Sequence, residues 1–286
     1  LIVCNNAVVS PGLINPHDHI TFANNGPKGH GTERYEHRHD WRRGIRGHTK
    51  ISTPGGATAD HVRAAELRFV MSGVTSIAGA GGQSGLVRNV DASPALLEGL
   101  SIKPADSDTF PLNDRGGTLK KSGCDYPGIR TSASISSLDG YIPHISEGID
   151  EETRNEFVCL SAGTNDVIQK QTAVVHGIAM KPEDIEHYRR AQTALVWSPR
   201  SNIDLYGNTA AVTVFDNLGV QIALGTDWLP SGSMNIQREL ACASSLNTNY
   251  FGKHFSDEAL WRMVTTNAAF AVGAFDSIGM LKKGYV

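Results

Sequence analysis

Short apolar segments alternate with longer stretches of helical periodicity along the chain, most clearly in its second half. Helices are expected over residues 59–71, 151–160, 181–192 and 209–218, and in pieces interrupted by Pro94 within residues 86–100. Eight apolar segments are expected to be strands: residues 12–14, 74–78, 101–103, 129–135, 140–143, 172–175, 194–197 and 220–224. This alternation is typical of α/β proteins with a parallel sheet, and eight strands are what a (β/α)8 TIM barrel requires.

Two stretches rich in glycine, proline and charged residues interrupt the alternation, at residues 23–57 and 105–128. In a barrel such insertions follow strands and lie over the face that carries the active site. The basic part of the first stretch, residues 34–50, is interleaved with acids and histidines. It therefore indicates a solvated loop rather than a surface for nucleic acid.

The composition fits a large folded domain. The chain has 286 residues, 40% of them hydrophobic and 19% charged, and a formal net charge of −3. This length suits one barrel of roughly 250 residues or two ordinary domains. The balanced charge argues against a nucleic-acid partner, and no apolar run approaches the ~20 residues of a membrane span. No signal peptide is recognisable; because the sequence begins at Leu1, a preceding targeting segment would lie outside it.

The cysteine pattern indicates no metal ribbon or redox motif, because Cys4, Cys124, Cys159 and Cys242 form no CxxC pair. Cys159 and Cys242 fall on apolar faces of expected helices and are interpreted as buried thiols. Free thiols favour a reducing compartment, and the expected location is cytoplasmic.

The position of histidines relative to strands separates candidate ligands from background. Catalytic groups of a parallel barrel lie at the C-terminal ends of strands. Of the 11 histidines, four directly follow an apolar strand segment: His17, His19, His144 and His176. His17 and His19 are two residues apart, so on an extended chain both face one side and can hold one divalent ion. Two ordinary polar residues after a strand would show the same spacing.

Two further features qualify this pattern. His37 and His39 have the same spacing, but no strand precedes them, and they are expected in a solvated loop. Asp227 follows the apolar run 220–224, where a carboxylate is costly unless it is paired or bound to a metal; a helix N-cap would explain it equally well. The joint order, with histidines after the first, fifth and sixth strands and an aspartate after the last, indicates a metal site.

These residues resemble the signatures of the amidohydrolase superfamily, in particular its deaminase and chlorohydrolase branch with one metal ion. The segment His144-Ile-Ser-Glu147 is similar to the His-x-x-Glu of that branch, and residues 196–198 depart from it because relatives often carry a histidine there. The resemblance is weak between residues 26 and 127. The matching segments are residues 11–19, 144–147, 175–177, 198–202, 225–227, 267–269 and 278–284.

The resemblance implies a fold and a ligand set. The barrel would span residues 10–278, and residues 1–9 and 279–286 would be remnants of a small composite β-sandwich. One divalent ion, zinc with iron as the alternative, would be bound by four protein ligands: His17, His19, His144 and Asp227. Asp227 would take a proton from the attacking water and deliver it to the leaving group.

The resemblance also implies further catalytic groups. His176 would hydrogen-bond the attacking water or the developing oxyanion, and Glu147 would shuttle a proton to a ring nitrogen or leaving amine. A buried histidine and a solvated acid are the plain alternatives. Four residues are candidate substrate contacts, each with a structural alternative as core, surface or supporting residue: Trp197, Arg200, Asn202 and Trp228.

The expected function is hydrolysis of a C–N bond, by deamination or cyclic-amide cleavage, in a small nitrogen-heterocyclic substrate. A two-metal amidohydrolase with carboxylated Lys103 and a non-catalytic metal-binding barrel are the alternatives. Glu147 and His176 count against a purely structural metal site, which has no role for nearby acids. A homodimer is the base-rate expectation.

Overall fold

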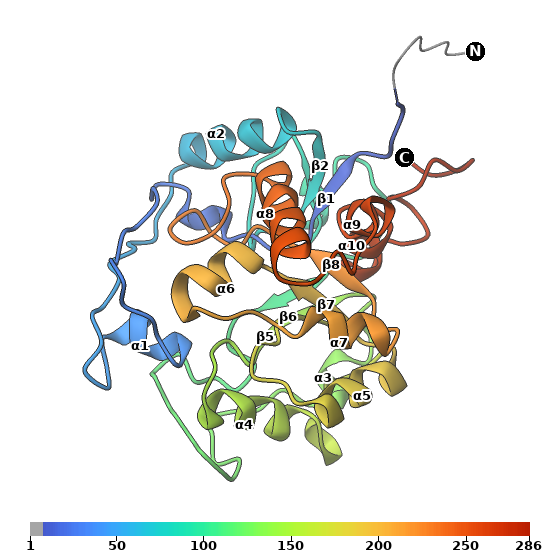
Figure 1. The fold of residues 1–286 in the computed structure, drawn as a ribbon. Coiled ribbons are helices and arrows are strands. Elements are labelled where there is room, and N and C mark those ends of the chain that lie inside the picture. The colour runs from blue at the N-terminus through green and yellow to red at the C-terminus, as the bar shows by residue number, and fades with distance from the viewer. Residues whose placement is uncertain (1–7) are drawn as a thin grey trace.

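The computed structural model describes residues 8–286, which form parallel strands surrounded by helices (Figure 1). The strands are β1 (Leu13–Asn15), β2 (Val74–Ile77), β3 (Arg88–Asn89), β4 (Asp106–Asp108), β5 (Tyr141–Ile145), β6 (Ala173–His176), β7 (Ala194–Trp197) and β8 (Ile222–Leu224). The α-helices are α1 (Arg38–Arg43), α2 (Ala59–Val70), α3 (Ser132–Ile135), α4 (Glu151–Leu160), α5 (Pro182–Ala191), α6 (Pro199–Tyr206), α7 (Val212–Asn217), α8 (Ile236–Asn249), α9 (Asp257–Arg262) and α10 (Thr266–Ala271). Three 3-10 turns cover Ile20–Phe22, Pro94–Leu96 and Gly163–Asn165.

Neighbouring strands pair in parallel throughout the described chain, in two sheets of order β1-β2-β3 and β4-β5-β6-β7-β8. The pairing places the carboxyl ends of the strands on one side: His144 of β5 is in register with Val175 of β6, and Trp197 of β7 with Leu224 of β8. The expected α/β fold with parallel strands is therefore confirmed.

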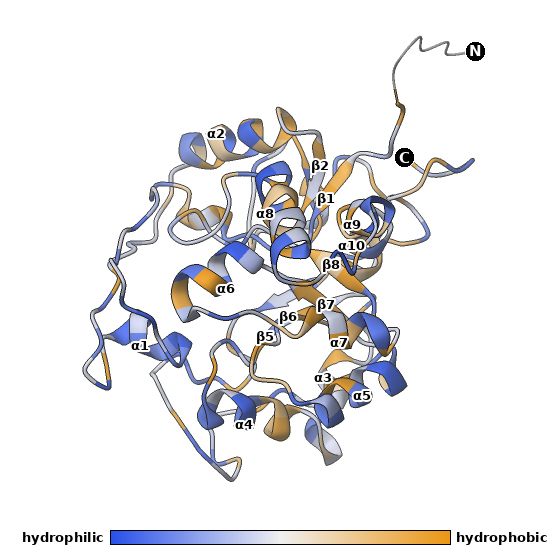
Figure 2. Ribbon diagram, in the orientation of Figure 1, coloured by the Kyte–Doolittle hydropathy of each residue, from blue (hydrophilic) through white to orange (hydrophobic). Residues whose placement is uncertain are grey.

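Alternate residues of β6, β7 and β8 face two different hydrophobic clusters. Val174 and Leu195 pack among the helices, whereas Val175 and Val196 belong to a second cluster that also contains Ala223. This separation follows from the two-residue period of a strand. Figure 2 shows β7 and β8 as predominantly hydrophobic, in contrast to the largely hydrophilic α1. Burial on both faces explains why these strands are continuous apolar runs in the sequence.

Six of the eight expected strands are confirmed, and the third and fourth are wrong. The third strand is Arg88–Asn89 rather than residues 101–103, and the fourth is Asp106–Asp108 rather than residues 129–135. Both are short and polar, so they carry no apolar signal. The second half of the misassigned segment is α3, whose first turn is capped by the Thr131 side chain.

The four expected helices are present as α2, α4, α5 and a shorter α7, and α4 has the predicted bounds. Residues 86–100 hold β3 and a 3-10 turn at Pro94–Leu96 instead of α-helical pieces. The first insertion contains α1. Residues 279–286 form no strand, and most of the other expected sandwich remnant lies outside the described residues, so the sandwich stays a prediction. None of the helices described in residues 8–286 is long and apolar enough to cross a membrane.

The cysteine interpretation is corrected by the structure. Cys159 forms a disulfide with Cys124, so it is not a free buried thiol. Cys242 is free and half-buried, and Cys4 lies outside the described residues. Cys124 belongs to the second insertion, whose path cannot be predicted from periodicity, and this is why the pairing was missed. The inference of a reducing compartment rested on free thiols at Cys159 and Cys242, and only Cys242 remains as support.

Candidate metal centre and catalytic cavity

Three imidazole rings meet at the carboxyl ends of β1 and β5. The Nε2 atom of His17 lies 3.3 Å from that of His19 and 3.1 Å from that of His144. The third pair, His144 and His19, is separated by 3.2 Å. His17 and His19 come from the segment directly after β1, and His144 is the fourth residue of β5, as the sequence pattern predicts.

Asp227 brings a carboxylate to the same point from the segment after β8. Its Oδ1 lies 3.5 Å from His17 Nε2 and 3.6 Å from His19 Nε2. Gly225 permits this approach, because a Cβ at that position would lie 2.6 Å from the Cβ of His17. Asp227 has a left-handed φ of 55°, a conformation that costs about 1–3 kcal/mol in a residue with a side chain.

The spacing of these four atoms fits a divalent ion. Three mutually adjacent Nε2 atoms cannot all be satisfied by hydrogen bonds to one another, because a neutral imidazole carries only one N–H. Ligand bonds of ~2.0–2.1 Å in tetrahedral geometry would place neighbouring ligand atoms roughly 3.3–3.4 Å apart. The observed separations of 3.1 to 3.6 Å lie around this value.

Burial favours the neutral form of the imidazoles, which is the form that binds metal. It lowers the pKa of His17 well below its ordinary value, and the nearby His19 and His176 rings lower it further. Burial also lowers the pKa of His144, with His17 and His19 adding to the effect. The pKa of His19 is lowered mainly by burial, although Asp227 and Glu147 act in the opposite direction.

Other side chains orient the candidate ligands. The Oγ of Ser198 lies 2.9 Å from Nδ1 of His17, on the ring edge opposite the cluster. The hydroxyl of Ser201 donates to Oδ2 of Asp227 at 2.6 Å, and the backbone N–H of Trp228 donates to Oδ1 at 2.7 Å. Contacts of this kind fix ring and carboxylate orientation around a metal site.

His176 and Glu147 lie beside the cluster. His176 ends β6 with a left-handed φ of 73°, and its Nδ1 donates to Oδ1 of Asn202 at 3.0 Å. The other ring nitrogen of His176, Nε2, takes no part in this bond and lies 3.7 Å from Oε2 of Glu147. The other oxygen of Glu147 accepts a hydrogen bond of 2.7 Å from Tyr206.

The candidate substrate contacts fall into different environments. Trp228 lines the cavity beside the cluster, but Trp197 is fully buried in the core, where its Nε1 donates to Thr209. Trp197 is therefore not placed to stack on a substrate, because it ends an apolar strand and points among the helices. Arg200 donates a hydrogen bond to Ser233 and does not line the cavity. Asn202 accepts a hydrogen bond from His176 and does not line the cavity either.

The cavity above the cluster has a volume of about 390 Å³ and is lined by both insertions as well as by strand ends. The first insertion contributes Trp41 and Arg42, and the second contributes Phe110 and Arg115. Both insertions therefore lie over the face that carries the candidate ligands. These four residues were missed individually, because loop residues carry no periodic signal that indicates where they point.

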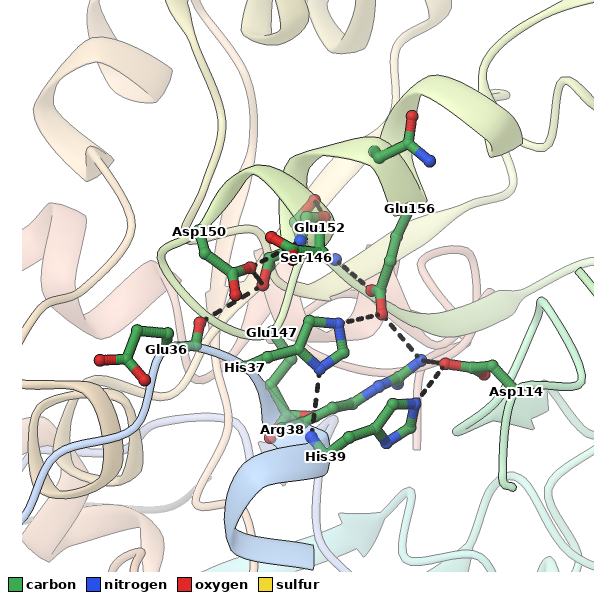
Figure 3. A network of polar contacts seen from close by, with 12 residues as sticks. Glu36, His37, Arg38, His39, Asp114, Ser146, Glu147, Asp150, Glu152 and Glu156 are labelled. Atoms are coloured by element: carbon green, nitrogen blue, oxygen red, sulfur yellow. Dashed lines mark hydrogen bonds and ion pairs between the residues drawn. The ribbon is translucent and has the colours of Figure 1, made fainter. Parts of the chain in front are cut away.

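His37 and His39 are buried, with 1% and 0% of their surfaces exposed, so their assignment to a solvated loop is wrong. Both take part in a network around the buried Arg38 (Figure 3). His37 pairs with Glu156 at 3.1 Å, and His39 with Asp114 at 2.9 Å. Arg38 contacts the same two carboxylates. Their partners come from distant segments, which is why a local charge pattern could not indicate the burial.

Lys103 does not fit a bridging role between two metal ions. Its side chain is largely exposed, and its Nζ lies 3.7 Å from Asp139 on the surface. It is not among the residues that line the cavity. The two-metal alternative therefore loses its candidate carboxylated lysine.

Comparisons with known proteins identify similar sequences and similar folds. A family model described as the amidohydrolase family matches residues 124–286, more than half of the chain. A 5-methylthioadenosine/S-adenosylhomocysteine deaminase of Clostridium tetani is 25% identical over 151 residues, which cover 50% of this chain and 35% of the relative. An aminodeoxyfutalosine deaminase of Deinococcus radiodurans is 37% identical over 81 residues, covering 28% of this chain and 19% of the relative. The matches thus span about a third or less of these two relatives.

Solved structures show the same fold. The zinc complex of atrazine chlorohydrolase from Arthrobacter aurescens TC1 has a TM-score of 0.65 at 17% identity, covering 96% of this chain and 73% of that chain. An adenosine deaminase from Xanthomonas campestris with bound zinc has a TM-score of 0.57 at 13% identity, covering 96% of this chain and 70% of that chain. At these identities the likeness concerns the fold alone.

Proposed function

The chain belongs to the amidohydrolase family, and from this premise we propose that it is a metal-dependent hydrolase that cleaves a C–N bond of a small nitrogen-heterocyclic substrate. The reaction would be a deamination or the opening of a cyclic amide. The observation that carries the proposal is the convergence of three Nε2 atoms within 3.1 to 3.3 Å of one another, with an Asp227 oxygen 3.5 to 3.6 Å from two of them.

His17, His19, His144 and Asp227 would hold one divalent ion, with zinc as the expected metal and iron as the alternative. When bound, such an ion supplies Lewis-acid activation of water, lowering its pKa toward ~7. The two deaminases named above support this choice of chemistry, and zinc is the metal bound in the two solved structures of similar fold.

Asp227 is the proposed general base and acid. Its Oδ2 accepts from Ser201 and its Oδ1 from the Trp228 N–H, so the carboxylate is held in one orientation beside the histidines. A fixed carboxylate can take the proton of an attacking water and return it to a leaving amine. Burial of Asp227, with 3% of its surface exposed, limits competition from bulk water.

Glu147 and His176 are the remaining catalytic groups of the proposed site. His176 keeps its free Nε2 toward the cavity through its bond to Asn202 and would bond the attacking water or its developing charge. Glu147 lines the cavity and would move a proton to a ring nitrogen of the substrate. A purely structural metal site would need neither group.

We also infer that the two sheets belong to one closed (β/α)8 barrel. The N–H of Ala105 donates to the carbonyl of Val90 at 2.8 Å, which links the segments after β3 and before β4. The N–H of Asp227 donates to the carbonyl of His17 at 3.0 Å, which links the segments after β8 and β1. These contacts join both pairs of sheet edges, as closure requires.

Metal content per chain, measured by elemental mass spectrometry on protein purified without added metal or chelator, tests the metal site. About one zinc or iron per chain is expected, and His19→Ala should lose most of it, because it removes one of four ligands. His187→Ala is the matched control, since His187 lies on α5 and pairs with Asp166 away from the site. About two ions per chain, or none after reconstitution, would contradict the one-metal site.

Ammonia release from a panel of amino-substituted nitrogen heterocycles tests the activity. Asp227→Asn should lower kcat by a factor of about 100 or more, because the amide cannot accept the water's proton. Unchanged turnover in this variant would overturn the catalytic assignment. Metal retention without turnover on any heterocycle or cyclic amide would favour the non-catalytic barrel.

A further inference from the structure

The cavity above the candidate metal site carries more positive than negative side chains. Its charged lining consists of two acids, Glu147 and Asp227, and four cations: Arg38, Arg42, Lys50 and Arg115. Both acids have assigned roles in the proposed chemistry. The cations come from the two insertions, and all four precede the residues that the family model matches, 124–286.

Arg38 is already neutralised. It is fully buried, and its Nη2 lies 2.8 Å from Asp114 and 3.2 Å from Glu156, while its Nη1 donates to the carbonyl of Thr109. Arg38 therefore links the first insertion to the second insertion and to α4 (Figure 3). Because both carboxylates offset its charge, it is not a candidate to bind an anionic ligand.

In the part of the chain that the structure describes, the other three cations have no such carboxylate partner. Within residues 8–286, no carboxylate lies within 4.0 Å of the charged groups of Arg42, Lys50 or Arg115. Burial lowers the pKa of Arg42 to about 10, and the charge of Arg38 lowers it further, whereas Glu147 and Asp114 act in the opposite direction.

Phe110 holds two of these guanidinium groups together. The central carbon of Arg42 lies 4.4 Å from the centre of the Phe110 ring, and that of Arg115 lies 5.9 Å from it. Arg42 also donates from Nη1 to Nδ1 of His39, which fixes the side chain further. An arginine held over an aromatic ring keeps N–H groups free at its edge, and these match the geometry of an oxyanion.

We propose that Arg42 and Arg115, held over Phe110, form a subsite for an oxyanion group of the substrate, a carboxylate or a phosphate. This inference rests on the proposed function, which supplies the heterocyclic substrate. It adds that the heterocycle carries an anionic substituent directed toward the insertions. Lys50 lines the same cavity and adds to the positive field. The heterocycle would then lie at the candidate metal site while the two arginines bind the opposite end of the substrate.

Binding of inorganic phosphate and of acetate, titrated separately by calorimetry at constant ionic strength, tests the subsite. Saturable binding of at least one anion is expected, and the double variant Arg42→Gln/Arg115→Gln should weaken it by roughly tenfold or more, since charge-assisted bonds are lost. Preference for phosphate or for acetate identifies which oxyanion the subsite takes. Arg43→Gln, an exposed neighbour on α1, should leave binding unchanged.

Two outcomes would overturn the subsite: no saturable binding of either anion, or equal binding by the wild type and the double variant. The second result is also what anion binding at the metal would give, so the titration is repeated after chelation. Because Arg42 contacts His39, the single variant Arg115→Gln at an exposed position guards against a folding defect. The titration needs neither turnover nor metal, so failure of the proposed hydrolase is recognised separately by ammonia release and metal content.

Discussion

Glu147 owes its position to a chain of hydrogen bonds among buried side chains. Trp41 Nε1 donates to the Tyr206 hydroxyl at 2.8 Å, and that hydroxyl donates to Glu147 Oε1 at 2.7 Å. Burial raises the pKa of Tyr206 well above its ordinary value, and Glu147 adds to the effect, so Tyr206 keeps its proton as a donor. Trp41 comes from the first insertion and Tyr206 from α6. The orientation of the proposed proton shuttle therefore depends on segments far from it in sequence.

Replacing Tyr206 with phenylalanine should lower kcat in the ammonia-release assay by about tenfold while KM changes little. The phenyl ring fills the same space, but Glu147 loses a charge-assisted hydrogen bond of about 1.5–3 kcal/mol. Tyr250→Phe is the control, because Tyr250 is largely exposed. A variant with a kcat equal to that of the wild type would show that Tyr206 does not position Glu147.

The candidate metal ligands could be predicted from the sequence because each sits at the end of an apolar strand. A strand determines where its last side chains point, so His144 and Asp227 were recognisable without knowledge of the loops. Trp197 shows the limit of this reasoning: it also ends a strand but faces the helices. The left-handed backbone at Asp227 and His176 follows from tertiary packing, and no local pattern indicates it.

Elements with little apolar content could not be predicted in the same way. β4 has the sequence Asp-Ser-Asp, and its pairing with β5 depends on backbone hydrogen bonds rather than on buried side chains. The first insertion likewise folds through charge pairing, with α1 bringing Arg38 to Asp114 of the second insertion and to Glu156 of α4. Such pairs depend on contacts between distant segments, which periodicity does not report.

The substitution Asp114→Asn should lower the free energy of unfolding by about 3–5 kcal/mol, because it leaves the buried Arg38 with one carboxylate instead of two. Arg38 and His39 hold the pKa of Asp114 well below its usual range against the opposing effect of burial, so the carboxylate is charged at neutral pH. Urea denaturation at pH 7 measures the change. Asp125→Asn, at an exposed position in the same insertion, should change stability by less than about 1 kcal/mol. A similar loss in both variants would contradict a specific role for the network.

At the scale of the whole molecule, the buried acid Glu239, which lies outside the candidate metal site, links α8 to α6 and makes the stability of the fold depend on pH. Glu239 of α8 is fully buried, and its Oε1 accepts from the backbone N–H of Arg200 in α6 at 3.0 Å. Its Oε2 has no hydrogen-bond partner within the described chain. Burial raises the pKa of Glu239 to about 7, against the favourable charge of Arg200, and Asp227 raises it further. The folded protein therefore binds a proton at Glu239 over a range in which the unfolded chain has already released it.

The sign of the resulting pH dependence follows from this difference. An acid whose pKa is higher in the folded than in the unfolded state stabilises the fold fully below its unfolded pKa of about 4.5, and the contribution is lost as the pH rises through about 7. Wild-type protein should therefore lose about 3 kcal/mol relative to Glu239→Gln between pH 4.5 and pH 8. The glutamine keeps an acceptor for Arg200 and cannot ionise, and pH effects of the metal ligands cancel in the difference. Urea denaturation of both proteins across this range measures it, and parallel stability curves would show that Glu239 ionises alike in both states.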